Sequence, residues 1–152
     1  MELRRVTETS EAAVHNRELA ADHVRRARSR LRAIDVLHEE ESWADVVREA
    51  QEALELALKG LLRAFGVDPP RSHDVSDVLT AERERLPEAL RGRVDELAAA
   101  SRRLRRDREL AFYGAADLTP SSFYSREDAE RARDSVRAAV EAIVPFVLDG
   151  ES

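Results

Sequence analysis

Apolar residues recur at alternating steps of three and four along most of the chain, the spacing that gathers side chains on one face of an α-helix. The first such run covers about residues 11–38. Its apolar stripe consists of Ala20, Val24, Ala27, Leu31 and Ile34. The acidic residues at 39–41 break the stripe, so we predict that the first helix ends there.

The second run, over about 43–65, is the most apolar segment of the chain. Ser42 precedes it and Asp45 follows three residues later. This spacing lets the hydroxyl group cap a backbone N–H and places a carboxylate near the positive end of the helix. Gly66 is the expected carboxyl-terminal cap, and the Pro-Pro pair at 69–70 prevents continuation. We therefore expect this helix to lie at the centre of the fold.

Two weaker helical segments follow. A short helix is predicted over about 74–85. The next begins near Pro87, because proline suits the first turn of a helix. Its apolar positions are Leu90, Val94, Leu97, Leu104 and Ala111. Gly114 and Thr119–Pro120 then predict a loop.

The last helix opens with another capping pattern, in which Asp128 follows Ser125 by three residues. Its stripe consists of Ala132, Val136, Ala139, Val140, Ile143 and Val147. The Asp-Gly pair at 149–150 ends it, and no segment alternates apolar and polar residues as a strand would. We predict an all-α fold: an antiparallel up-down helical bundle of four long helices and one short helix. A single domain is expected over 1–152, with its core at about 11–148.

Composition excludes several classes of protein but does not indicate one function. The 152 residues carry a net charge of −6 and no cysteine. No apolar run approaches the roughly 20 residues of a membrane helix. We therefore expect a cytoplasmic protein without disulfides or membrane contact. The negative net charge argues against nonspecific electrostatic binding to nucleic acid. His15 and His23 lie about 12 Å apart along one helix, too far to share an ion, so we predict no metal site. The sequence has no H-E-x-x-H, no Walker loop and no G-x-G-x-x-G motif, and we predict no cofactor.

Arginine crowds the segment RRLRRDRELAFY at 102–113. Arg108 lies four residues after Leu104 and therefore falls on the apolar stripe of its helix. A guanidinium group on that stripe must be paired or face a crevice, unless the helix turns the position outward near its end. Gln51 lies on the apolar face of the second helix and has two similar explanations: a ligand-facing amide, or a core amide bonded to the backbone.

Two segments, read together, resemble the HEPN domains, small helical modules of bacteria and archaea. The resemblance covers about residues 17–148. The first segment is WADVVREAQEALELALKGLLRAFGVDPPRSHDVSDVL, with its proline turn and the pair His73–Asp74. The second is RELAFYGAADLTPSSFYSREDAERA, in which an arginine is followed by Phe-Tyr-Gly, a proline-containing loop and a capped last helix. Their order and spacing are more specific than either segment alone.

The resemblance implies a site near Arg108. Many HEPN proteins are dimers that cut RNA with an arginine, a polar residue and a histidine four to six residues after the arginine. Here Arg108 matches the arginine and Glu109 the polar residue, but Tyr113 stands where histidine is expected. RNA cleavage without a metal needs a base and an acid, and imidazole suits both near neutral pH. Tyrosine, with an ordinary pKa of about 10, acts mainly as a donor.

We therefore favour a noncatalytic, dimeric HEPN-like module that binds a nucleotide or an RNA phosphate. The residues expected to bind are Arg105, Arg108, Tyr113 and Gln51, with Arg108 and Tyr113 also the candidates for any catalysis. The resemblance further implies a homodimer and a nucleotidyltransferase partner, as in toxin–antitoxin pairs. Two alternatives stay open: a divergent metal-independent ribonuclease toxin, and a bundle whose role is purely structural interaction.

Overall fold

The computed structural model describes the backbone of residues 2–69, 71, 74–113 and 123–148, and the side chains of these residues except 2–10 and 108–113. No strand occurs in this described part. The elements in chain order are α1 (Glu2–Glu39), α2 (Trp43–Ala64), α3 (Val75–Ala81), the 3-10 turn η1 (Arg83–Arg85), α4 (Glu88–Arg91), α5 (Val94–Tyr113) and α7 (Arg126–Val147).

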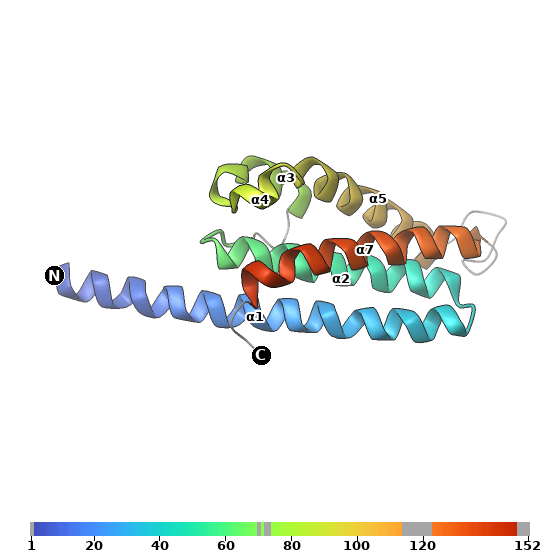
Figure 1. Cartoon of the computed structure of the whole chain (residues 1–152), viewed down its shortest axis with the longest axis horizontal. Coiled ribbons are helices and arrows are strands. Elements are labelled where there is room, and N and C mark those ends of the chain that lie inside the picture. The colour runs from blue at the N-terminus through green and yellow to red at the C-terminus, as the bar shows by residue number, and fades with distance from the viewer. Residues whose placement is uncertain (1, 70, 72–73, 114–122, 149–152) are drawn as a thin grey trace.

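The four long helices are α1, α2, α5 and α7, and their directions alternate along the chain (Figure 1). α2 lies in the middle and packs against the other three, whereas α5 and α7 touch each other at few positions. α3 and α4 lie beside α5, and the first turns of α1 extend past the other helices (Figure 1). The predicted all-α bundle of four long helices and a short one is confirmed. No helix in the described part is long and apolar enough to span a membrane.

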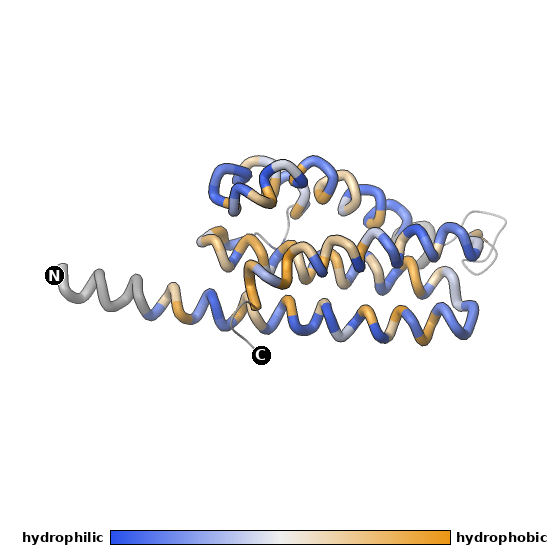
Figure 2. Tube along the Cα trace, viewed as in Figure 1, coloured by the Kyte–Doolittle hydropathy of each residue, from blue (hydrophilic) through white to orange (hydrophobic). Residues whose placement is uncertain are grey.

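The central position of α2 follows from its composition. Twelve of its 22 residues are buried, including Leu54, Leu58 and Leu61. Figure 2 shows apolar positions along α2, where the long helices face one another. Gly60 allows α1 to come close, because a Cβ atom there would lie 2.7 Å from a methyl carbon of Val24. The prediction that the second helix is the most buried segment is confirmed.

Local capping explains the end of α2 and the start of α7. Gly66, at φ +84°, follows α2, and the backbone N–H groups of Gly66 and Val67 donate to carbonyls of the last turn. Ser125 and Asp128 form the predicted capping box of α7. Ser42 differs from the prediction: its hydroxyl donates to the Asp45 carboxylate (2.6 Å) and caps no backbone N–H. The Ser42 backbone has ψ 71°, whereas the capping residue Ser125 has the extended ψ of 169° that is typical of helix N-caps.

Three boundaries differ from the sequence prediction. α1 begins at Glu2 rather than near residue 11, and the short helix expected over 74–85 is divided into α3 and η1. The helix expected from Pro87 onward is divided at Gly92, where α4 ends and after which α5 begins. Glycine in a helix interior is disfavoured by about 1 kcal/mol. The expected stops at 114–120 and 149–150 lie outside the described residues.

Candidate functional site

The arginine-rich segment forms the second half of α5. The buried face of α5 includes Leu97, Ser101 and Leu104. Successive helix residues are rotated by about 100°, so the arginines on either side of this face point in different directions. They fall into two groups, one beside α2 and α3 and the other beside α7.

On the first side, Arg105 links α5 to two other helices. Its Nη2 donates to Oε1 of Glu55 on α2 (3.2 Å), and its Nη1 lies 3.5 Å from Oδ1 of Asp74 at the start of α3. Oε2 of Glu55 accepts a hydrogen bond from Nε2 of Gln51 (3.1 Å). We call Gln51, Glu55, Asp74, Ser76 and Arg105 the α2–α3–α5 cluster. It brings together two of the four residues expected to bind ligand.

Hydrogen bonds and nearby arginines stabilise the charged form of Asp74 in this cluster. Its Oδ1 accepts from the backbone N–H (2.9 Å) and the hydroxyl (2.7 Å) of Ser76, which caps α3. Burial opposes the charged form of Asp74. The hydrogen bonds from Ser76 and the nearby guanidinium groups of Arg105 and Arg102 outweigh burial, so the pKa of Asp74 is lowered. Negative charge is therefore stable at Asp74, and it holds Arg105 in place.

Gln51 is 4% exposed, so it faces the protein interior. Its hydrogen bond goes to the Glu55 side chain, not to the backbone as one of the sequence explanations required. The Gln51 Oε1 atom is buried without a hydrogen-bond partner. A buried amide oxygen without a donor is less favourable than one that is hydrogen-bonded.

Arg108 and Tyr113 belong to the last turns of α5. Their side chains lie outside the described residues. The predicted roles of both residues, in binding or in catalysis, therefore stay predictions.

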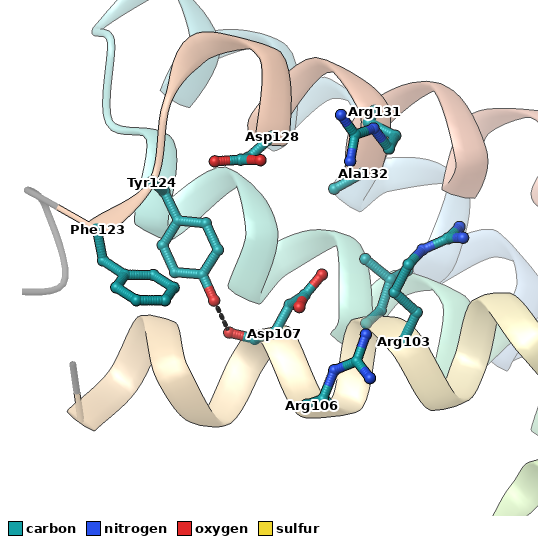
Figure 3. A pocket seen from close by; sticks show the side chains of 9 residues that line it. Arg103, Arg106, Asp107, Phe123, Tyr124, Asp128, Arg131 and Ala132 are labelled. Carbon is teal, nitrogen blue, oxygen red and sulfur yellow. Dashed lines mark hydrogen bonds between the residues drawn. The ribbon is translucent and has the colours of Figure 1, made fainter. Parts of the chain in front are cut away.

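On the second side of α5 lies a cavity of about 290 Å³, which we call the α5–α7 pocket. Figure 3 shows its side chains converging from the end of α5 and the start of α7. The polar residues that line it are Arg103, Arg106, Asp107, Tyr124, Asp128 and Arg131. Of these, sequence reasoning singled out the arginine run and, only as a helix cap, Asp128. It did not connect them, because nothing local links residue 107 with residues 124–131.

The three pocket arginines, Arg103, Arg106 and Arg131, are exposed. None forms an ion pair or hydrogen bond with a residue that the structure describes, in contrast to Arg105. Exposed guanidinium groups without a carboxylate partner keep all their donors available for an anion. This availability is the main chemical feature of the pocket.

Asp107 supplies the opposite charge. Burial raises its pKa, and the guanidinium groups of Arg106 and Arg103 oppose that shift without abolishing it. Its side chain forms no hydrogen bond with a residue in the described ranges. Asp128 differs, because its Oδ2 accepts from the backbone N–H (2.9 Å) and the hydroxyl (3.0 Å) of Ser125.

Tyr124 closes one end of the pocket. It is 7% exposed, and its hydroxyl donates to the backbone carbonyl of Asp107, which ties the segment before α7 to α5 (Figure 3). Burial, reinforced by the charges of Asp107 and Asp128, raises the pKa of Tyr124 to about 12. The phenol therefore stays protonated at physiological pH and serves as a donor. Phe123 packs edge-on against its ring, with the ring centroids 5.0 Å apart.

A comparison with protein families identifies the family of this bundle. A model of the HEPN domain matches residues 20–146. The chain belongs to the HEPN domain family. No curated protein sequence and no solved structure matches the chain. The matched part of this HEPN domain contains both sides of α5, so the cluster and the pocket are features of the domain itself.

Proposed function

We propose that this HEPN domain is a noncatalytic module that binds the phosphate of a nucleotide or of RNA at the carboxyl-terminal half of α5. The observation that carries the proposal is the α5–α7 pocket, where Arg103, Arg106 and Arg131 have no partner in the described structure. Guanidinium groups bind phosphate through paired, charge-assisted hydrogen bonds. Arg108 follows on the same helix, two residues after Arg106.

Arg105 has a different place in the proposal. Its two carboxylate partners already satisfy its charge, so a phosphate would have to compete with Glu55 and Asp74. We therefore assign Arg105 and Gln51 to holding α5 against α2 and α3. The proposed phosphate contacts are the pocket arginines together with Arg108.

We propose that the domain does not cleave RNA, because the titratable groups of the site are poorly suited to acid–base catalysis. The Tyr124 phenol does not ionise near neutral pH, so it cannot accept a proton. Tyr113 replaces the histidine of the family motif. Asp107 is the one group of the pocket whose raised pKa suits a base. If the domain were a divergent ribonuclease, Asp107 would therefore be the expected base.

Partner binding is proposed on family membership alone. HEPN domains often dimerise, so we propose a homodimer with twice the 17.1 kDa chain mass. We also propose a nucleotidyltransferase as second partner, in a toxin–antitoxin type system. Light scattering at micromolar concentration tests the first proposal, and a single chain mass would refute it. A neighbouring nucleotidyltransferase gene and co-elution of the two products test the second.

The phosphate site is tested by calorimetry with AMP, GMP and a short single-stranded RNA. Arg103→Ala/Arg106→Ala should weaken binding of all three at least about tenfold, because charge-assisted hydrogen bonds contribute roughly 1.5–3 kcal/mol each. The matched control is Arg28→Ala/Arg32→Ala, which removes the same charge from exposed positions on α1. Equal loss in both variants would mean that only net charge matters and would overturn the site.

Cleavage is tested on the same RNA with wild type and Asp107→Asn. No cleavage is expected from either protein. Cleavage by wild type that disappears in Asp107→Asn would establish the divergent ribonuclease instead. Binding of the RNA measured in parallel separates a lost reaction from a lost substrate.

A further inference from the structure

The α5–α7 pocket contains polar groups that phosphate binding alone does not require. Its rim carries three guanidinium groups, but Asp107 places a carboxylate among them (Figure 3). A carboxylate repels phosphate, so a pocket shaped for phosphate alone would be better without it. The pocket therefore suits a ligand that is anionic at one end and offers hydrogen-bond donors at the other.

Asp107 is the carboxylate available to such donors. Its side chain points from α5 into the space between α5 and α7 (Figure 3). It forms no hydrogen bond with a residue that the structure describes, whereas Asp128 is engaged by Ser125. A half-buried carboxylate without donors gains most when a ligand supplies them, since it has already lost part of its hydration.

An aromatic surface lies at the same end of the pocket. Phe123 is 36% exposed and stands edge-on to Tyr124, whose hydroxyl is held by α5. Exposed aromatic rings beside a cationic groove are the usual platform for stacking a nucleobase. The cavity volume of about 290 Å³ lies near the lower end of small-molecule pockets, which suits one mononucleotide better than a longer ligand.

We propose that the α5–α7 pocket selects guanine nucleotides, with Asp107 accepting hydrogen bonds from the base, Phe123 stacking on it, and Arg103, Arg106 and Arg131 holding the phosphate. Guanine presents two parallel donors, N1–H and the N2 amino group, which match the two oxygens of one carboxylate. Adenine and cytosine present one exocyclic amino group beside an unprotonated ring nitrogen, and uracil presents one N–H between two carbonyls. This inference rests on the proposed phosphate site and adds the identity of the base.

The test measures affinity by calorimetry for GMP, IMP, AMP, CMP and UMP, with inorganic phosphate as the ligand that has no base. IMP is GMP without the N2 amino group, so it isolates the second donor. The inference predicts that GMP binds at least about tenfold tighter than AMP, CMP and UMP, with IMP in between. A tenfold difference corresponds to about 1.4 kcal/mol, within the range of one bidentate contact to a base.

Asp107→Asn removes the charge and one acceptor while preserving the shape of the side chain. It should reduce GMP affinity to that of AMP and leave phosphate affinity unchanged or stronger. The control is Asp134→Asn, which removes an exposed carboxylate from α7 that pairs only with Arg133 in the described structure. Thermal denaturation of both variants confirms that they are folded.

The outcomes separate this inference from the proposed function. If all five nucleotides bind wild type equally and the Arg103→Ala/Arg106→Ala variant loses them all, the phosphate site stands and guanine selection is wrong. If GMP is preferred but Asp107→Asn keeps that preference, Asp107 is not the selecting residue and the inference also fails. If no nucleotide binds, both the proposed function and the inference fall.

Discussion

Arg105 and Arg106 are neighbours in the sequence, yet their surroundings differ completely. Arg105 lies between Glu55 and Asp74, while Arg106 lines a pocket and has no partner in the described part of the chain. One step of about 100° along a helix is enough to move a side chain from one neighbouring surface to another. Arginine density in a sequence therefore does not measure the capacity to bind anions, because ion pairing on the folded surface decides which guanidinium groups are available.

The carboxylates on the two sides show the same contrast. Asp74 has a lowered pKa, because hydrogen bonds from Ser76 and the arginines of the cluster outweigh burial. Asp107 has a raised pKa, because burial outweighs the more distant pocket arginines. The charged groups of the cluster are thus paired with one another, whereas the guanidinium groups and the Asp107 carboxylate of the pocket have no hydrogen-bond or ion-pair partner among the described residues. An unbalanced surface of this kind is the better candidate for binding a ligand.

The largest loss of stability is expected for Leu104, the buried residue of α5 that lies between the cluster and the pocket. Leu104 is 1% exposed, and its truncation in Leu104→Ala should lower the free energy of unfolding by about 2–5 kcal/mol. Urea denaturation followed by circular dichroism measures this loss. The control Val36→Ala, at a position 58% exposed on α1, should change stability by less than about 0.5 kcal/mol. Equal effects would mean that α5 is not anchored through this face.

The next effect separates the two sides directly. Arg105→Ala leaves Glu55 and Asp74 without their shared cation and should cost about 1 kcal/mol, or a fall in Tm of about 2–4 °C. Arg106→Ala removes no described contact and should cost less than about 0.5 kcal/mol. Differential scanning fluorimetry of the two variants gives the comparison. A larger loss for Arg106→Ala would reverse the assignment of structural and available arginines.

A similar loss of about 1 kcal/mol is expected for Tyr124→Phe, which removes the hydroxyl that donates to the Asp107 carbonyl. The aromatic ring remains, so packing against Phe123 is preserved. Denaturant unfolding should show a lower midpoint with an unchanged slope. An unchanged midpoint would show that this hydrogen bond does not fasten the segment before α7 to α5.

The smallest effects are those of pH. The groups that face Asp107 are Arg103, Arg106, Tyr124, Asp128 and Arg131. With these neighbours, the Asp107 carboxyl should titrate above the ordinary aspartate pKa of 3.8, and Asp74 below it. Carbon-detected NMR of the side-chain carboxyls measures both. Asp107 titrating below Asp74 would contradict the contrast between the two sides.

The same shifts predict opposite contributions to stability. Asp74 stabilises the fold above its unfolded pKa, and this contribution is lost as the pH falls through its lowered folded pKa. Asp107 contributes most at low pH, and its contribution declines as the pH rises from about 3.8 through its raised folded pKa. Asp107→Asn should therefore remove the decline, which unfolding measured between pH 3 and 7 can detect.

Much of the fold could be predicted because it depends on local spacing. The apolar stripe of α2, the glycine at its end and the Ser125–Asp128 capping box each involve residues within a few turns of one another. The division at Gly92 could not be predicted with equal ease, because a single glycine is tolerated in many helices. The order of the four long helices therefore followed from the sequence, but the division into α3, η1 and α4 and several boundaries did not.

The candidate site depended on contacts between distant residues. Gln51 and Arg105 were singled out, but Glu55, which connects them, looks like any exposed acidic residue of α2 in the sequence. The approach of Tyr124 to Asp107 requires the packing of α7 near α5, and no pattern along the chain indicates it. Periodicity identifies the buried face of a helix, whereas the partners of its polar residues are set by tertiary packing.

The proposed phosphate site consists of available arginines, not of paired ones. Calorimetry with GMP on Arg105→Ala and Arg106→Ala, with Tm recorded for both, tests it most directly. Arg106→Ala should lower the affinity for GMP about tenfold with little change in Tm, and Arg105→Ala should lower Tm while its affinity for GMP is unchanged. Loss of GMP affinity in Arg105→Ala with full affinity in Arg106→Ala would mean that the paired arginine, not the available one, binds the phosphate.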